Sequence, residues 1–179
     1  LDAMGSGFLI PLAADIEVSD GRFSWDWDPP PSSLGETTRA PLSFHYPGQA
    51  AGAPFHEPDR AILKFNNFWT IELPEGCSLL VLHPVNREEL PFRTLTGLVD
   101  ADLYSDACIQ FPARWLAPEF EGTLAKGTPV AQCIPVRREA LELSFETLEG
   151  ARASAFREVQ AALAEEPGVY RKRFRAKQR

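Results

Sequence analysis

The chain has 179 residues and a mass of 19.9 kDa, with 44% hydrophobic and 24% charged residues, which suits one globular domain with a buried core. Its formal net charge of −7 disfavours generic nucleic-acid binding, because most of the surface repels phosphate. No apolar run approaches the roughly 20 residues that a membrane-spanning helix needs, so we expect no membrane partner.

Three cysteines, Cys77, Cys108 and Cys133, lie among apolar neighbours with no paired spacing. This pattern is typical of reduced thiols in a cytoplasmic protein. The first residues also lack a basic region followed by an apolar stretch, so we expect no signal peptide.

The first predicted element is a strand at residues 23–27, where Phe23, Trp25 and Trp27 alternate with polar residues. Residues 29–59 are rich in Pro, Gly, Ala and Ser and show no period, which predicts a long irregular loop with one short strand at 42–47. We therefore interpret residues 1–60 as an N-terminal extension.

Short strands follow one another from residue 61, each bounded by Pro, Gly, Asn or Asp, as in an antiparallel β-barrel or sandwich. A glycine turn, PEGC at 74–77, joins the second of these strands to the third. The predicted strands cover 61–65, 68–73, 78–84, 92–99, 107–112, 129–136 and 141–148. The core domain is thus expected to span residues 61–148.

One helix is predicted after this core. Ala153, Phe156, Val159 and Leu163 form an apolar stripe at helical spacing, and Pro167 with Gly168 ends it. Residues 170–179 then hold six of the 18 Lys and Arg residues, which we interpret as a solvated basic tail. Helix and tail make up a third segment, 149–179.

Four segments in order, ELPEGC, HPVNR, GLVDADLY and GTPVAQCIPV, resemble the motif order of the dUTPase and dCTP-deaminase superfamily. Gly97, Val99, Asp100 and Tyr104 look like its Gly-apolar-Val-Asp segment, and Gly127 to Gln132 look like its Ala-Gln strand. The segment is also similar to an uncharacterised family of bacterial and phage proteins. The resemblance implies a β-clip fold, mostly β, and a homo-oligomer, namely a trimer.

The phosphate motif departs from that of dUTPases. Their Pro-Arg-Ser-Gly corresponds here to Pro84-Val85-Asn86-Arg87, and the glycine-rich cap at the C-terminus is replaced by a helix. A triphosphate needs cations or many N–H donors. The resemblance therefore implies a small ligand, nucleotide-like in kind, bound without the dUTPase phosphate chemistry.

The resemblance assigns Asp100 the role of aligning a water molecule for attack. The alternative is that Asp100 and Asp102 are turn residues that bond their own backbone. Tyr104 is either a wall of the ligand pocket or a half-buried aromatic residue with its hydroxyl in solvent.

Gln132 interrupts an apolar strand, so its amide contacts either a ligand or a neighbouring strand. Asn86, Arg87 and Arg93 come from the stretch that corresponds to the phosphate motif, and the two arginines could replace its missing cation. The alternative for both arginines is an ordinary surface position.

The sequence names no cofactor. His45, His56 and His83 lack the paired spacing of a cupin-like metal enzyme, which stays a lesser alternative with no metal ligand assigned. Two hypotheses remain. The chain is either a ligand-binding β-clip protein, with Asp100, Tyr104 and Gln132 at one hollow, or an interaction module whose pocket is filled by its own extension.

Overall fold

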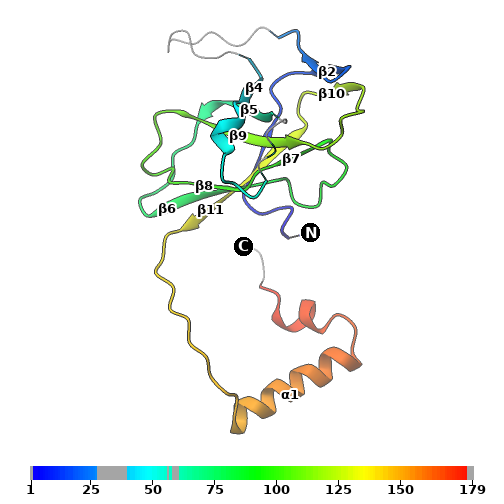
Figure 1. Cartoon of the computed structure of the whole chain (residues 1–179). Helices are drawn as coiled ribbons and strands as arrows, with labels where there is room; N and C mark the ends of the chain where they lie inside the picture. Colours follow the sequence, from blue (N-terminus) through cyan, green and yellow to red (C-terminus); the bar gives the residue numbers. More distant parts are fainter. Residues whose placement is uncertain (1, 28–39, 56, 58–60, 177–179) are drawn as a thin grey trace. The chain divides into compact units, whose positions relative to one another are not determined.

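The computed structural model describes residues 2–27, 40–55, 57 and 61–176 (Figure 1). The chain divides into two compact units, Leu1–Glu139 and Ala140–Arg179. Of the loop expected at 29–59, residues 29–39, 56, 58 and 59 lie outside the described residues, and His56 is among them. Each unit is described by itself.

The regular elements that the structure describes in the first unit are strands and a 3₁₀ turn at Pro47–Ala50. Its described residues form eleven strands in three antiparallel sheets, with no closed barrel among them, which confirms the mostly β fold class. Sheet A has the order β1 (Phe8–Pro11), β11 (Pro129–Arg137), β6 (Cys77–Leu82), β8 (Gly97–Val99). Sheet B has the order β10 (Gly122–Leu124), β2 (Ile16–Ser19), β3 (Arg22–Ser24). Sheet C has the order β4 (Leu42–His45), β5 (Ile62–Thr70), β9 (Cys108–Trp115), β7 (Phe92–Thr94).

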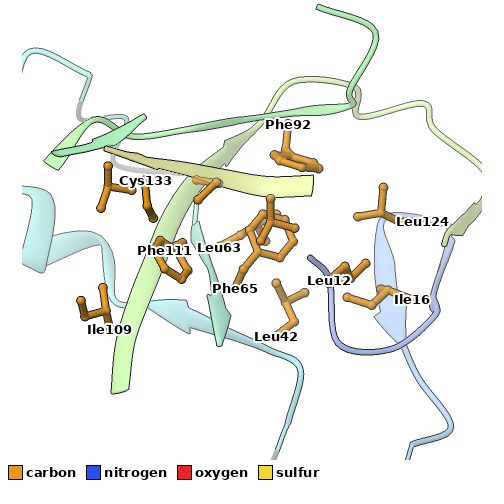
Figure 2. Close-up of a cluster of buried hydrophobic side chains, with 14 of the residues drawn as sticks. Leu12, Ile16, Leu42, Leu63, Phe65, Phe92, Ile109, Phe111, Leu124 and Cys133 are labelled. Carbon is orange, nitrogen blue, oxygen red and sulfur yellow. The ribbon is translucent and has the colours of Figure 1, made fainter. Parts of the chain in front are cut away.

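One hydrophobic core is shared by all three sheets, and Figure 2 shows 14 of its side chains, ten of them labelled. Strand alternation supplies it: Ile109, Phe111 and Ala113 of β9 are buried, whereas Gln110 between them is exposed. The rings of Phe65 and Phe92 meet at 4.7 Å. Each fully buried side chain of this size contributes about 1.5–3 kcal/mol relative to exposure.

The N-terminal residues take part in sheet A. β1 pairs with β11 in the register Phe8↔Cys133 and Leu9↔Gln132. Just before β1, Gly7 has φ +69°, and a Cβ placed there would lie 1.9 Å from the carbonyl oxygen of Cys133. Only glycine lets the chain approach β11 this closely. β1, β2 and β10 were not predicted from the sequence.

Two predicted strands differ in extent from the observed ones. The strand predicted at 23–27 corresponds to β3, which ends at Ser24. Trp27 lies beyond this strand, and its ring packs on that of Phe68 with the centroids 4.8 Å apart. The predicted break at Asn66–Asn67 is absent, and β5 runs through it. The asparagine side chains bond to nearby groups, since Nδ2 of Asn66 donates to the carbonyl of Ala40 and Nδ2 of Asn67 to that of Trp69.

The predicted strand at 92–99 is two strands in different sheets. β7 belongs to sheet C, where the N–H of Leu95 still donates to the carbonyl of Pro112 at 2.8 Å. From Gly97 the chain pairs with β6 of sheet A instead. The turn at 74–77 likewise connects β5 of sheet C to β6 of sheet A, so these strands do not form a hairpin, although Gly76 has the expected positive φ of 79°.

The strand expected at 141–148 is not formed. These residues have no regular secondary structure and pair with no strand in the described part of the chain, and Leu141, Leu143 and Phe145 are 93%, 82% and 89% exposed. Alternation of apolar and polar residues marks a potential strand, but a strand needs hydrogen-bonded neighbours for stability. The sequence pattern was therefore insufficient here.

The second unit contains the predicted helix, α1 (Gly150–Glu165), followed by a π-helical turn at Tyr170–Phe174. No residue of α1 is buried, and Phe156 and Leu163 of its apolar stripe are 53% and 45% exposed. Within the described residues, no helix has the length and apolar character required to cross a membrane.

Candidate functional site

Asp100 and Asp102 lie at one end of sheet A, where β8 ends, β6 begins and β11 ends. Arg138, directly after β11, brings these three strand ends together. It donates through Nη1 to Oδ1 of Asp102 at 2.8 Å and to Oδ1 of Asp100 at 3.2 Å, and through Nη2 to Oδ2 of Asp102. Its backbone N–H also donates to the carbonyl of Gly76.

Asp102 is the central acceptor of this group, which we call the sheet-end cluster (Gly76, Ser78, Asp100, Asp102 and Arg138). Its side chain is only 4% exposed, and it also accepts the N–H of Gly76 at 2.9 Å. The hydrogen bond from Arg138 lowers the pKa of Asp102 from 3.8 to about 2, although burial opposes this and the Gly76 N–H assists it. The same contact raises the pKa of Arg138.

Asp100 is half exposed and accepts the hydroxyl of Ser78 at 2.7 Å. Tyr104 closes the following turn, with its N–H bonded to the carbonyl of Asp100 at 2.8 Å, and its side chain is 50% exposed. Two carboxylates and one guanidinium leave the cluster with one net negative charge, so it repels a phosphate. Its hydrogen bonds connect the ends of three strands, so the cluster has a structural role.

Gln132 is 1% exposed, and its amide is occupied by backbone groups. Nε2 donates to the carbonyls of Ala3 and Ser6, both at 2.7 Å, and Oε1 accepts the N–H of Val85 at 3.0 Å. Both donors of the amide are thus used. Gln132 bridges the N-terminal turn to the loop after β6 and offers no N–H donor to a ligand.

Asp100 and Gln132 do not line one hollow. Asp100 bonds Ser78, whereas Gln132 pairs with Leu82, four residues further along β6. At roughly 3.3 Å per residue, their attachment points on β6 are about 13 Å apart. They belong to opposite ends of the same strand pair, and the shared hollow expected from the sequence is not formed.

The stretch that corresponds to the phosphate motif forms a turn. Asn86 is exposed with φ +61°, Arg87 pairs with Glu89, and Arg93 pairs with Glu88 at 3.3 Å. Both arginines are therefore partnered by neighbouring carboxylates at the surface.

The histidines of the described residues are bonded within the fold. His83 accepts the N–H of Thr94 through Nδ1 and bonds the carbonyl of Arg87 through Nε2, and Nδ1 of His45 contacts Gln49. Wherever the structure describes the chain, no three His, Cys, Asp or Glu residues gather into a group that could hold a metal ion. The buried thiol of Cys133 has its pKa raised to about 12 by desolvation, which disfavours the nucleophilic thiolate.

A cavity of about 690 Å³ opens on another part of the first unit, between β3, β4, β5 and β9. Its volume is in the range of small-molecule sites. We call it the aromatic cavity. The residues that line it are Gly21, Arg22, Phe23, Phe44, Ala50, Phe55, Glu57, Ala61, Ile62, Leu63, Arg114, Trp115 and Pro118.

Aromatic rings form much of its wall. Phe23 packs edge-on against Trp115 at 5.0 Å and against Phe44 at 6.0 Å. The indole N–H of Trp115 donates to the carbonyl of Ala117 at 2.7 Å, which fixes the ring in place. A wall of fixed rings with few polar groups is typical of a site for a flat apolar molecule.

The charged groups of the wall are few. Arg114 donates from Nη2 to Oε1 of Glu57, and both side chains are a little over one third exposed. None of the residues predicted for the site, Asp100, Asp102, Tyr104, Asn86, Arg87, Arg93 and Gln132, lines this cavity. The cavity brings together residues from 21 to 118, and no pattern in the sequence indicated it in advance.

Neither family models, nor curated proteins, nor solved structures match this chain.

Proposed function

We propose that this protein binds a small organic molecule in the aromatic cavity. The observation that carries the proposal is a hollow of about 690 Å³ whose wall includes Phe23, Phe44 and Trp115. Buried aromatic faces supply most of the contact area for ligands of this size. The sheet-end cluster has its hydrogen bonds satisfied inside the fold and supports no role in this binding.

A flat ring system is the kind of ligand that the wall favours, and a nucleotide base is one such ring. The charges favour fewer phosphates than a dUTPase binds, because the described part of the cavity wall has two arginines and one of them is paired with Glu57. We therefore propose that the chain shares its ancestry with β-clip proteins and forms a trimer as dUTPases do. We propose no hydrolytic activity for it.

The test is a thermal-shift series with neutral and anionic aromatic compounds, followed by equilibrium dialysis of those that raise Tm. Ala61 is exposed at the cavity wall, so Ala61→Trp fills the hollow without altering the core. We expect Ala61→Trp to abolish the shift, whereas Ala140→Trp, in the other unit, preserves it. Absence of binding by every compound contradicts the proposal.

An interaction module is the second candidate function. The extended residues 141–148 carry three exposed apolar side chains, Leu141, Leu143 and Phe145, on alternate positions. A segment with this alternating pattern can form a strand by adding to the edge of a sheet in another chain. A protein acting in this way would show self-association or partner binding that Leu143→Ser and Phe145→Ser together remove.

The free state of Cys77, Cys108 and Cys133 supports a reducing compartment, and we propose the cytoplasm. The net charge of −7 supports partners other than nucleic acid.

A further inference from the structure

The wall of the aromatic cavity is positively charged, in contrast to the whole chain. Its described residues include two arginines, Arg22 and Arg114, and one carboxylate, Glu57, which together give a formal charge of +1. The chain as a whole carries −7. An excess positive charge at the only strongly aromatic hollow described above favours a ligand of opposite sign.

The two arginines are not equivalent. Arg114 is held by Glu57, which offsets its charge. Arg22 forms no ion pair or side-chain hydrogen bond with any residue in the described part of the chain. A guanidinium without a carboxylate partner at an apolar hollow is available to bind one.

The hairpin between β2 and β3 fixes the backbone of Arg22. Ser19 pairs with Arg22 across a two-residue turn in which Asp20 and Gly21 have φ of 50° and 69°. Such turns match the twist of the strands that they join. The N–H of Asp20 also donates to Oε1 of Glu121 at 2.9 Å, so the start of β3 is held against β10 and its connection. Arg22 is thus part of an ordered wall.

We infer that the ligand is an organic monoanion with a flat apolar body and one carboxylate, and that Arg22 provides its counter-charge. The inference rests on the proposed function and specifies its ligand class. A planar guanidinium forms two parallel hydrogen bonds to a carboxylate, and the aromatic wall excludes water from one side of the pair. The negative charge of a dianion or a triphosphate is larger than the single positive charge of the wall.

The test compares two probes with the same ring system, 2-naphthoate and its neutral amide, 2-naphthamide, by equilibrium dialysis or calorimetry. We expect 2-naphthoate to bind about tenfold more tightly than 2-naphthamide, because a charge-assisted hydrogen-bonded pair contributes a factor of this size. Arg22→Gln should reduce this preference to less than twofold while affinity for 2-naphthamide stays unchanged. Arg171→Gln, an exposed arginine of the second unit, is the matched control and should keep the preference.

The results of these binding measurements distinguish the proposed function, binding in the aromatic cavity, from the inference that Arg22 provides the counter-charge. If neither probe binds the native protein, the proposed function fails and the inference with it. If both probes bind equally, or if Arg22→Gln keeps the tenfold preference, the inference fails while the proposed function stands. A preference that disappears with Arg22→Gln and persists with Arg171→Gln supports the inference.

Discussion

Asp102 is a carboxyl group kept ionised by its surroundings. Two bonds from Arg138 and one from the Gly76 N–H surround a side chain that has almost no access to water. These contacts favour the charged form over the protonated form, and they lower the pKa to about 2. The ionised state of Asp102 is therefore linked to the folded state.

This linkage predicts an acid-dependent loss of stability. Because the pKa of Asp102 is lower in the folded than in the unfolded chain, the unfolded chain takes up its proton first as the pH falls. The stabilisation is complete above the ordinary value of 3.8 and declines between about pH 4 and pH 2. Urea unfolding at pH 7 should show Asp102→Asn to be less stable than the native chain, and the gap should narrow toward pH 2.5.

Asp106→Asn is the control for this prediction, since Asp106 is exposed and outside the sheet-end cluster. The difference in stability between Asp106→Asn and the native chain should be small at pH 7 and should not narrow toward pH 2.5 as it does for Asp102→Asn. A constant gap for Asp102→Asn between pH 7 and pH 2.5 would contradict the linkage.

Sequence reasoning identified the unusual polar residues but not their partners. Gln132 stood out because it interrupts an apolar strand, and the structure gives it the bridging role that the sequence left as one of two alternatives. Asp102 was named, yet its partner Arg138 was not, because 36 residues separate them and no local pattern relates the two. Contacts between distant segments depend on the tertiary fold.

At the scale of elements, β1 depends on a single glycine. Gly7 combines a positive φ with a close approach to the backbone of Cys133. Any side chain there meets both a conformational penalty and a steric clash with main-chain atoms, which cannot move aside as a flexible side chain can. Gly7 thus determines whether β1 can join sheet A.

We expect Gly7→Ala to destabilise the protein by about 2 kcal/mol or more. The matched control is Gly97→Ala on β8, because a Cβ there meets no atom within 4 Å and the φ is not positive. That change should be neutral or stabilise the fold by up to about 1 kcal/mol. Urea unfolding followed by tryptophan fluorescence measures both. Equal effects at the two positions would show that the close approach at Gly7 is unimportant.

Strands were predicted correctly where an alternating apolar pattern coincided with a neighbouring strand. β6 lies within two residues and β11 within one residue of the predicted ranges, and β9 was predicted over most of its length. The prediction failed at 141–148, where the same alternation has no neighbour, and at β1 and β2, whose four-residue length gives too few positions for a pattern. Sheet membership was not predictable, as the division of 92–99 between two sheets shows.

At the scale of the whole molecule, the two units differ in how they are stabilised. Every residue of the hydrophobic core belongs to the first unit. In the second unit, α1 has no buried residue. Isolated helices of this length are marginally stable in water.

A fragment of residues 1–139 should therefore fold by itself, with a cooperative thermal transition and ordered aromatic side chains in near-ultraviolet circular dichroism. A fragment of residues 140–179 should be largely unfolded at 25 °C, with low helix content in the far-ultraviolet spectrum. A first fragment that melts without cooperativity would contradict this expectation.

The candidate site was the least predictable feature. The aromatic cavity lies between strands of sheets B and C, and its wall joins residues that are up to 97 positions apart, from Gly21 to Pro118. Composition and strand patterns identify aromatic residues, but they do not show which of them leave a space between them. The sequence therefore directed attention to the end of sheet A, where the polar residues are concentrated.

The pairing of β1 with β11 also has a consequence for biosynthesis. Phe8 finds its neighbour only at Cys133, and Asp15 accepts the N–H of Lys126, so the two closures of the first unit span more than one hundred residues. Contacts of such long range carry a large loop-closure cost and slow the search for the native topology. A nascent chain cannot complete this architecture until β11 has left the ribosome, so β1 stays unpaired until then, whereas β2 can pair with β3 at once.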